Sequence, residues 1–184
     1  MARTPSNMLP LSTQIEDFEL FDTVTQKMLS LSDITSEKPF VIMFICNHCP
    51  FVVHLHKGLQ MMVNRYKEKV DFIAISSNDI EKYPEDRPEL MTKLFLDLNF
   101  DFPYLFDENQ LVAKKLDAAC TPDFYLFNAK KQLIYRGQFD HARPGNEVEV
   151  SGKDLMFAID QALERKVIRE DLQKPSLGCN IKWK

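Results

Sequence analysis

The sequence FVIMFICNHCP, residues 40–50, sets the architecture of this chain. Its first six residues are apolar and uncharged, which is typical of a central parallel strand buried on both faces. From about residue 49 to residue 68 the apolar residues recur at steps of three and four, which predicts an amphipathic helix with Pro50 in its first turn. Cys46 and Cys49 therefore stand where a strand passes into a helix. The positive end of the helix dipole at such a corner favours a thiolate.

Apolar patterns on either side of this stretch predict the other elements. A second buried strand at 72–75 follows the helix, so the two strands should be parallel members of a βαβ unit. Upstream, residues 18–31 are patterned as a β-hairpin. Downstream, Asp86 and Glu89 are spaced as a capping box that would open a helix at 87–98. Further elements expected are an extended piece at 100–106, a helix capped by Asp107, a hairpin at 124–135 and a last helix starting at Ser151 and Asp154.

This order of elements predicts an α/β fold in which helices cover both faces of one mixed sheet. The N-terminal β-hairpin and a helical insert extend the basic pattern. With 184 residues and 45% hydrophobic content, the chain should form a single domain over residues 1–184. Residues 1–16 are expected to be an extended lead-in, and residues 170–184 form a C-terminal tail without hydrophobic periodicity.

Composition and charge limit the partners and the cellular location that we expect for this protein. The net charge is −4, with acidic and basic residues interleaved, so neither a nucleic acid nor a membrane surface is an expected partner. No segment has the pattern of a signal peptide or of a membrane span, and the expected location is cytoplasmic. Four cysteines are too few for a disulfide scaffold in a chain of this length. We therefore expect the closely spaced pair, Cys46 and Cys49, to have a chemical rather than a structural role.

A C-x-x-C pair at a strand-to-helix corner is typical of a redox motif, whereas a structural zinc site would need further paired ligands. In the redox interpretation Cys46 lies nearer the solvent, carries the thiolate and attacks a substrate disulfide, and Cys49 resolves the mixed disulfide. His48, when protonated, would stabilise that thiolate. The alternative for His48 is an exposed turn residue without an electronic role.

The motif CNHCP after a buried strand, together with CTPDF at 120–124, resembles the thioredoxin fold. In element order the resemblance spans about residues 15–166, and it is strongest to the branch that includes peroxiredoxins and thioredoxin-like cytochrome-maturation proteins. More narrowly, the chain resembles bacterial thioredoxin-family proteins described as probable thiol-disulfide isomerases, which share CNHCP and a terminal GCNIKW, here 178–183. The resemblance implies that Pro122 is cis and that Asn47, Thr121 and Pro122 contact the substrate, Thr121 through its backbone. No cofactor is implied.

Two departures from the family pattern bear on mechanism. The buried acid that thioredoxin carries six residues before its first cysteine corresponds here to Phe40, so Asp123, His48 or water would have to accept the proton. Peroxiredoxins place Thr or Ser three residues before the peroxidatic cysteine, and this position is Met43. A thiol peroxidase is therefore disfavoured. Asn78, at the carboxyl end of the second strand, is a candidate wall of the site.

Two further cysteines and two other functions remain open. Cys120 is expected near the site as a small buried side chain, and Cys179 could fold back from the tail as an extra resolving thiol. The leading function is thiol-disulfide exchange with protein or small-molecule thiols, served by a reductase or oxidant partner. A copper-handling or other metal-handling protein could use the same cysteines with a histidine as third ligand. A redox-inert binding module would leave the placement of the pair unexplained. The candidates for the third ligand are His54, His56 and His141.

Overall fold

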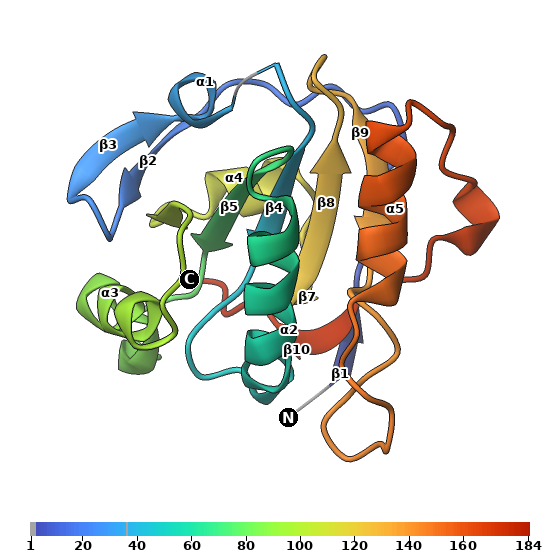
Figure 1. Cartoon of the computed structure of the whole chain (residues 1–184). Helices are drawn as coiled ribbons and strands as arrows, with labels where there is room; N and C mark the ends of the chain where they lie inside the picture. The colour runs from blue at the N-terminus through green and yellow to red at the C-terminus, as the bar shows by residue number, and fades with distance from the viewer. Residues whose placement is uncertain (1–2, 36) are drawn as a thin grey trace.

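The computed structural model describes residues 3–35 and 37–184 and is built around a seven-stranded mixed sheet (Figure 1). In spatial order the strands are β3 (Lys27–Ser30), β2 (Glu19–Asp22), β6 (Tyr104–Phe106), β5 (Asp71–Ser76), β4 (Phe40–Phe44), β8 (Asp123–Phe127) and β9 (Leu133–Gly137). The predicted hairpins are present as the antiparallel pairs β2–β3 and β8–β9.

The apolar run at the start of the quoted stretch forms β4, whose five residues are all buried. β4 pairs in parallel with β5 and antiparallel with β8, so Ile42 lies between Ile73 and Tyr125. The predicted parallel βαβ unit is confirmed. Alternate residues of β4 enter different core clusters: Val41 and Met43 pack on one face of the sheet, and Phe40, Ile42 and Phe44 pack on the other.

Helices cover both faces of the sheet, as predicted. α2 (Pro50–Tyr66) and α5 (Lys153–Leu163) lie in front of the sheet in Figure 1, and α4 (Leu111–Lys115) lies behind it. α3 (Pro88–Asp97) is the helical insert, and a short α1 (Leu31–Ile34) follows the first hairpin. Single 3₁₀ turns occupy Pro84–Asp86 and Glu170–Leu172. Within the part of the chain that the structure describes, no helix combines the length and apolarity needed to cross a bilayer.

A second, three-stranded sheet joins the two ends of the chain. Its order is β1 (Arg3–Pro5), β10 (Leu177–Asn180) and β7 (Cys120–Thr121), all antiparallel. The sequence predicted neither β1 nor β10, because both lie in segments without periodicity. In Figure 1 this sheet lies at the end of the molecule where α2 begins. The tail therefore packs beside the C-x-x-C corner.

The predicted capping box of α3 is wrong. α3 has Arg87 as its N-cap, and no side chain caps the helix. The Asp86 carboxylate instead accepts hydrogen bonds from the C-x-x-C loop. For α4, the Asp107 carboxylate does accept from the backbone N–H of Ala113 at 2.9 Å, although the N-cap position itself is Gln110.

The last helix, predicted to start at Ser151 and Asp154, begins at Lys153, but neither of these two side chains caps it. The N-cap of α5 is Gly152, which has a left-handed backbone with φ 65°. Asp140 rather than a local side chain accepts from the backbone N–H groups of Ser151 and Gly152, at 2.7 and 2.6 Å. A residue distant in sequence therefore satisfies the groups that local patterns had assigned to Ser151 and Asp154.

Gly58 occupies a buried position in the middle of α2, where glycine lowers helix propensity. A Cβ atom at this position would lie 2.6 Å from Val150 Cγ1 and 2.8 Å from Phe139 Cε1. Both distances are too short for carbon atoms in contact. Glycine is therefore required for the loop before α5 to pack against α2.

We predict that Gly58→Ala lowers the free energy of unfolding by about 1–3 kcal/mol, because overpacking outweighs the gain of up to about 1 kcal/mol in helix propensity. Urea denaturation of the variant and the wild type measures the difference. Lys57→Ala, at an exposed position of the same helix, is the control and should change stability by less than about 0.5 kcal/mol. A stabilised Gly58→Ala protein would contradict the packing argument.

Candidate functional site

The two cysteines of the quoted stretch lie between the end of β4 and the start of α2, as predicted. Cys49 is the N-cap residue of α2, and its carbonyl accepts from the N–H groups of Val52 and Val53, both at 2.9 Å. Both cysteines are buried, with exposed fractions of 1% for Cys46 and 0% for Cys49, so the expectation that Cys46 lies nearer the solvent stays a prediction. Since α2 begins at Pro50, the end of the helix dipole acts on Cys49 more directly than on Cys46.

Thr121 contacts both sulfur atoms. Its hydroxyl lies 3.4 Å from Cys46 Sγ, and its carbonyl accepts from the Cys49 thiol at 3.1 Å. The Thr121–Pro122 peptide bond is cis, as the resemblance implied. Through Thr121, both cysteines therefore contact the segment that leads into β8.

A hydrogen bond between the two thiols shifts their pKa values in opposite directions. The bond donated by Cys46 lowers the pKa of Cys49 to about 5, with further donors in Cys179 and Thr121, while burial opposes this shift. The same bond raises the pKa of Cys46 well above its ordinary range, together with burial and the negative charge of Asp86. The pKa of Cys49 is thus the lower of the two. The sequence interpretation placed the thiolate on Cys46 and took no account of Asp86, whose charge raises the pKa of Cys46.

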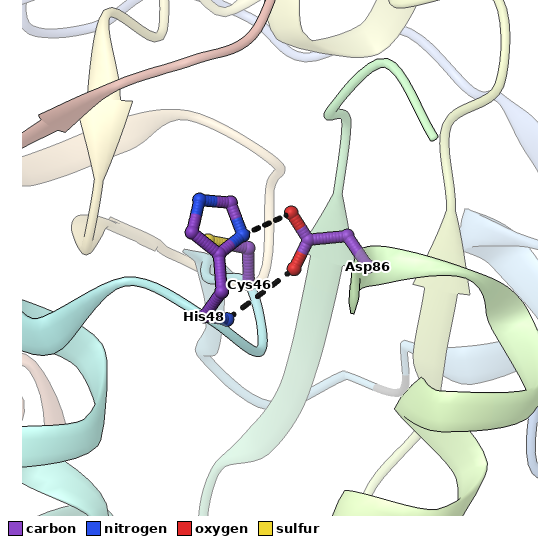
Figure 2. A group of neighbouring side chains, drawn as sticks. All are labelled: Cys46, His48 and Asp86. Atoms are coloured by element: carbon purple, nitrogen blue, oxygen red, sulfur yellow. Dashed lines mark hydrogen bonds and ion pairs between the residues drawn. The ribbon is translucent and has the colours of Figure 1, made fainter. Parts of the chain in front are cut away.

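Asp86 is the functional residue that the sequence interpretation missed. Its carboxylate is fully buried and accepts from the backbone N–H groups of Asn47 at 2.8 Å and His48 at 3.4 Å. It also accepts from Asn78 Nδ2 at 2.7 Å and pairs with His48 Nδ1 at 2.7 Å (Figure 2). One carboxylate therefore fixes the loop between the two cysteines. Its only signal in the sequence was the spacing to Glu89, which suggested a helix cap.

His48 is paired with Asp86 rather than left as an exposed turn residue. The hydrogen bond and charge of Asp86 raise the pKa of His48, although burial opposes the shift. The ring stacks on Tyr83 with centroids 5.7 Å apart, and its side chain is only 17% exposed. Ligand atoms of Cys46, His48 and Asp86 all lie within 4.8 Å of one another (Figure 2). When His48 is protonated, its positive charge therefore lies close to the Cys46 sulfur.

The side chains of the two asparagines expected at the site form hydrogen bonds with other parts of the protein. Asn78 does lie in the wall of the site, where its Oδ1 accepts from the backbone N–H of Lys182 at 2.8 Å. Asn47 donates to the carbonyl of Glu85 at 2.9 Å and accepts from the Tyr104 hydroxyl at 3.3 Å. The amide of Asn47 is thus committed to the loop, and its contact with a substrate stays a prediction, as does that of Pro122.

The backbone of Thr121, expected to receive an extended substrate, is paired with the chain's own tail. In β10, Cys179 lies opposite Thr121, and Asn180 lies opposite Cys120. Cys179 is 1% exposed and hydrogen-bonds to Cys49. Burial and this contact raise the pKa of Cys179 to about 12. The predicted return of the tail to the cysteine pair is therefore observed.

Asp123 and Cys120 lie outside the thiol cluster. Asp123 is opposite Phe44 in the β4–β8 pairing, so its side chain lies on the face of the sheet away from Cys46 and α2. Its carboxylate accepts from the Tyr125 hydroxyl at 3.0 Å, and burial raises its pKa to about 7. This placement does not support the suggestion that Asp123 replaces the missing buried acid, whereas the Asp86 carboxylate does lie near the Cys46 sulfur. Cys120 has its pKa raised above the ordinary range by burial.

The third metal ligand predicted from sequence is not at the site. Among the described residues, the group of three metal-binding side chains within reach of one another is Cys46, His48 and Asp86. His54 and His56 are on α2, and the His141 ring is hydrogen-bonded to Gln138 at 3.1 Å. A metal held with Cys46 would have to use His48, whose Nδ1 is engaged by Asp86.

The fold and its buried pair of neighbouring thiols define an oxidoreductase of the thioredoxin-like class. A match to a protein-family model supports this class and identifies the family within it. The AhpC/TSA family model matches residues 11–136, and the chain belongs to this family. No protein with a curated function matches the sequence significantly.

Solved structures confirm the thioredoxin-like fold. An uncharacterized conserved protein from Geobacillus kaustophilus is 49% identical over 100% of this chain and 97% of its own, with a TM-score of 0.96. A secreted disulfide oxidoreductase from Mycobacterium tuberculosis, homologous to DsbE of E. coli, is 15% identical over 78% and 94%, with a TM-score of 0.59. The peroxidoxin BcpB from Mycobacterium tuberculosis is 17% identical over 88% and 99%, with a TM-score of 0.63. The last two share the fold alone.

We predict that Asp86→Asn lowers the pKa of His48, because the substitution removes the charge that raises it while keeping a similar shape. Titration of the histidine ring signals by NMR measures the change, and His56, whose pKa is lowered by burial alone, serves as an internal control whose titration should not move. The ion pair stabilises the wild type fully below the ordinary histidine pKa of 6.5, and this stabilisation is lost as pH rises through the raised pKa. An unchanged His48 titration would contradict the role of Asp86.

Proposed function

We propose that this protein is a thiol-disulfide oxidoreductase in which Cys46 and Cys49 exchange a disulfide with thiol substrates. The observation that carries the proposal is the contact between two buried thiols, one of which has its pKa lowered to about 5. A thiolate beside a second thiol can both attack a disulfide and release the resulting mixed disulfide. The site therefore has the two groups that a two-electron exchange needs.

Cys46 is the group that meets the substrate. It precedes the partly exposed residues Asn47 and His48, whereas Cys49 is enclosed by Thr121 and Cys179. The proton shared between the two sulfur atoms passes to Cys49, and the Cys46 thiolate, beside His48, attacks one sulfur of the substrate disulfide. The first substrate sulfur leaves and takes up the proton from Cys49. The Cys49 thiolate then attacks Cys46, so the second substrate sulfur leaves as a thiolate and the Cys46–Cys49 disulfide forms.

The lowered pKa also bears on the reduction potential. A stabilised thiolate favours the reduced pair, so the disulfide is a stronger oxidant than one formed from ordinary thiols. Proteins with paired active-site cysteines span about −270 to −120 mV, and we expect this pair within that range. The substrates would be protein or small-molecule thiols and disulfides, with a separate reductase or oxidant completing the cycle. We also propose a cytoplasmic setting, in keeping with the small number of cysteines.

A metal-handling protein is the second candidate, and the closeness of Cys46, His48 and Asp86 favours it. Against this candidate, both oxygens of Asp86 already accept hydrogen bonds from the loop and from Asn78. Stoichiometric copper binding by the reduced protein without any disulfide reductase activity would support the metal function. A thiol peroxidase remains disfavoured, because Met43 occupies the position of the peroxide-binding Thr or Ser.

The proposal predicts a reversible two-thiol transition in glutathione redox buffers, measured by alkylation and mass spectrometry. In the wild type, Cys46 and Cys49 should lose and regain their thiols together, and Cys46→Ser should reduce insulin reductase activity to the uncatalysed rate. Cys120→Ser is the matched control, because Cys120 is equally buried but outside the pair, and it should retain activity. Two thiols that stay reduced across all buffers would contradict the proposed function.

A second prediction concerns the substrates. A Cys49→Ser variant lacks the group that releases the mixed disulfide, so it should accumulate covalent adducts at Cys46 in cells. These adducts are separated on non-reducing gels and identified by mass spectrometry. The Cys46→Ser/Cys49→Ser variant should capture nothing. If neither protein nor small-thiol adducts form at Cys46, the assignment of Cys46 as the attacking residue is wrong.

A further inference from the structure

The C-terminal strand brings a third sulfur atom to the pair. Cys179 in β10 lies directly opposite Thr121 in β7, and opposite residues of an antiparallel pair project their side chains to the same face. The Thr121 hydroxyl lies 3.4 Å from the Cys46 sulfur, and its carbonyl lies 3.1 Å from the Cys49 sulfur. The thiols of Cys46, Cys49 and Cys179 are therefore gathered around one residue.

The approach of β10 to this residue depends on Gly178. A Cβ atom at Gly178 would lie 2.0 Å from the Thr121 carbonyl oxygen, so any other side chain would push the strand away. At this close approach Cys179 donates hydrogen bonds to Cys49 through its thiol and its backbone N–H. Cys49 thus receives hydrogen bonds from two thiols, those of Cys46 and Cys179.

Strand register, rather than closeness in sequence, selects this third thiol. Cys120 is adjacent to Thr121 in sequence, but neighbouring residues of a strand project to opposite faces. Cys120 is paired with Asn180, and its sulfur contacts the carbonyl of Pro122 at 3.7 Å. Cys120 and Cys179 are therefore alike in burial, with exposed fractions of 0% and 1%, but differ in access to Cys49.

We propose that Cys179 is a third redox-active thiol, which moves the disulfide from Cys46–Cys49 to Cys49–Cys179. This inference rests on the proposed function. The Cys179 sulfur attacks Cys49, a Cys49–Cys179 bond forms, and the Cys46–Cys49 bond breaks. The proton lost by Cys179 is taken up by the departing Cys46 sulfur. No electrons enter or leave the chain in this step, so no further oxidant is needed.

Oxidation of the first pair prepares Cys179 for this step. In the reduced protein, the Cys49 thiolate is one of the causes that raise the pKa of Cys179. When Cys49 enters a disulfide its charge is lost, while the positive charge of Lys182 still favours a Cys179 thiolate. The transfer restores the Cys46 thiol beside His48. The disulfide is then held by Cys49 and Cys179, and the Cys46 thiol is free to react with a second substrate.

The test uses the full-length Cys46→Ser variant, which lacks the first pair but keeps the other three thiols. The reduced variant is oxidised with diamide, alkylated in denaturant, digested and mapped by mass spectrometry. We expect two of its three thiols to be lost together, in a disulfide that links Cys49 to Cys179 within one chain, with Cys120 fully alkylated. Wild-type protein treated in the same way should contain the Cys49–Cys179 peptide alongside the Cys46–Cys49 peptide.

Two double variants are the matched controls. Cys46→Ser/Cys120→Ser should still form the disulfide, and Cys46→Ser/Cys179→Ser should keep both remaining thiols. Retention of all three thiols in Cys46→Ser, together with absence of the Cys49–Cys179 peptide from the wild type, would overturn the proposal, as would a link from Cys49 to Cys120. Circular dichroism of each variant before oxidation verifies the fold, and the wild-type mapping does not depend on any substitution.

The same mapping separates failure of this inference from failure of the proposed function. If the wild type forms a reversible Cys46–Cys49 disulfide and Cys179 stays alkylated throughout, only the third thiol is excluded. If the wild type forms no reversible disulfide at Cys46, the thiol-disulfide function itself is excluded.

Discussion

The hydrogen bond between the thiols of Cys46 and Cys49 is the interaction on which the chemistry of this site depends. It lets two buried sulfur atoms hold a single negative charge, because one donates to the other. The lower pKa is that of Cys49, which is the N-cap of α2 and also receives hydrogen bonds from Cys179. A contact with the Thr121 carbonyl opposes ionisation of Cys49, so the anion requires several donors acting together.

Asp86 keeps the loop between the two cysteines in place. Its buried carboxylate accepts from two backbone N–H groups of the loop and pairs with His48. The negative charge of Asp86 raises the pKa values of both Cys46 and His48. Asn78 links the same carboxylate to Lys182 in the tail. The loop, the 3₁₀ turn at Pro84–Asp86 and the C-terminal segment are thus parts of one hydrogen-bonded network.

Local patterns in the sequence predicted most of the main sheet, because β4, α2 and both hairpins have strong periodicity or turn signals. The resemblance to the thioredoxin fold added the cis bond before Pro122. Contacts between distant segments were not predictable in this way. Asp86 has the spacing of a helix cap, and only the tertiary fold shows that its carboxylate is directed at the Asn47 and His48 N–H groups. Similarly, β10 is four residues long and pairs with residues far away in sequence, so nothing local marked it as a strand.

The most direct test of this account is the titration of thiolate absorbance in the ultraviolet, comparing the reduced wild type with Cys49→Ser. The account predicts that the wild type carries one thiolate that is protonated only as pH falls through about 5. The variant should lose this acidic transition, because the remaining Cys46 is buried beside Asp86. A wild type that forms thiolate only near the ordinary cysteine pKa of about 8.5 would contradict the account.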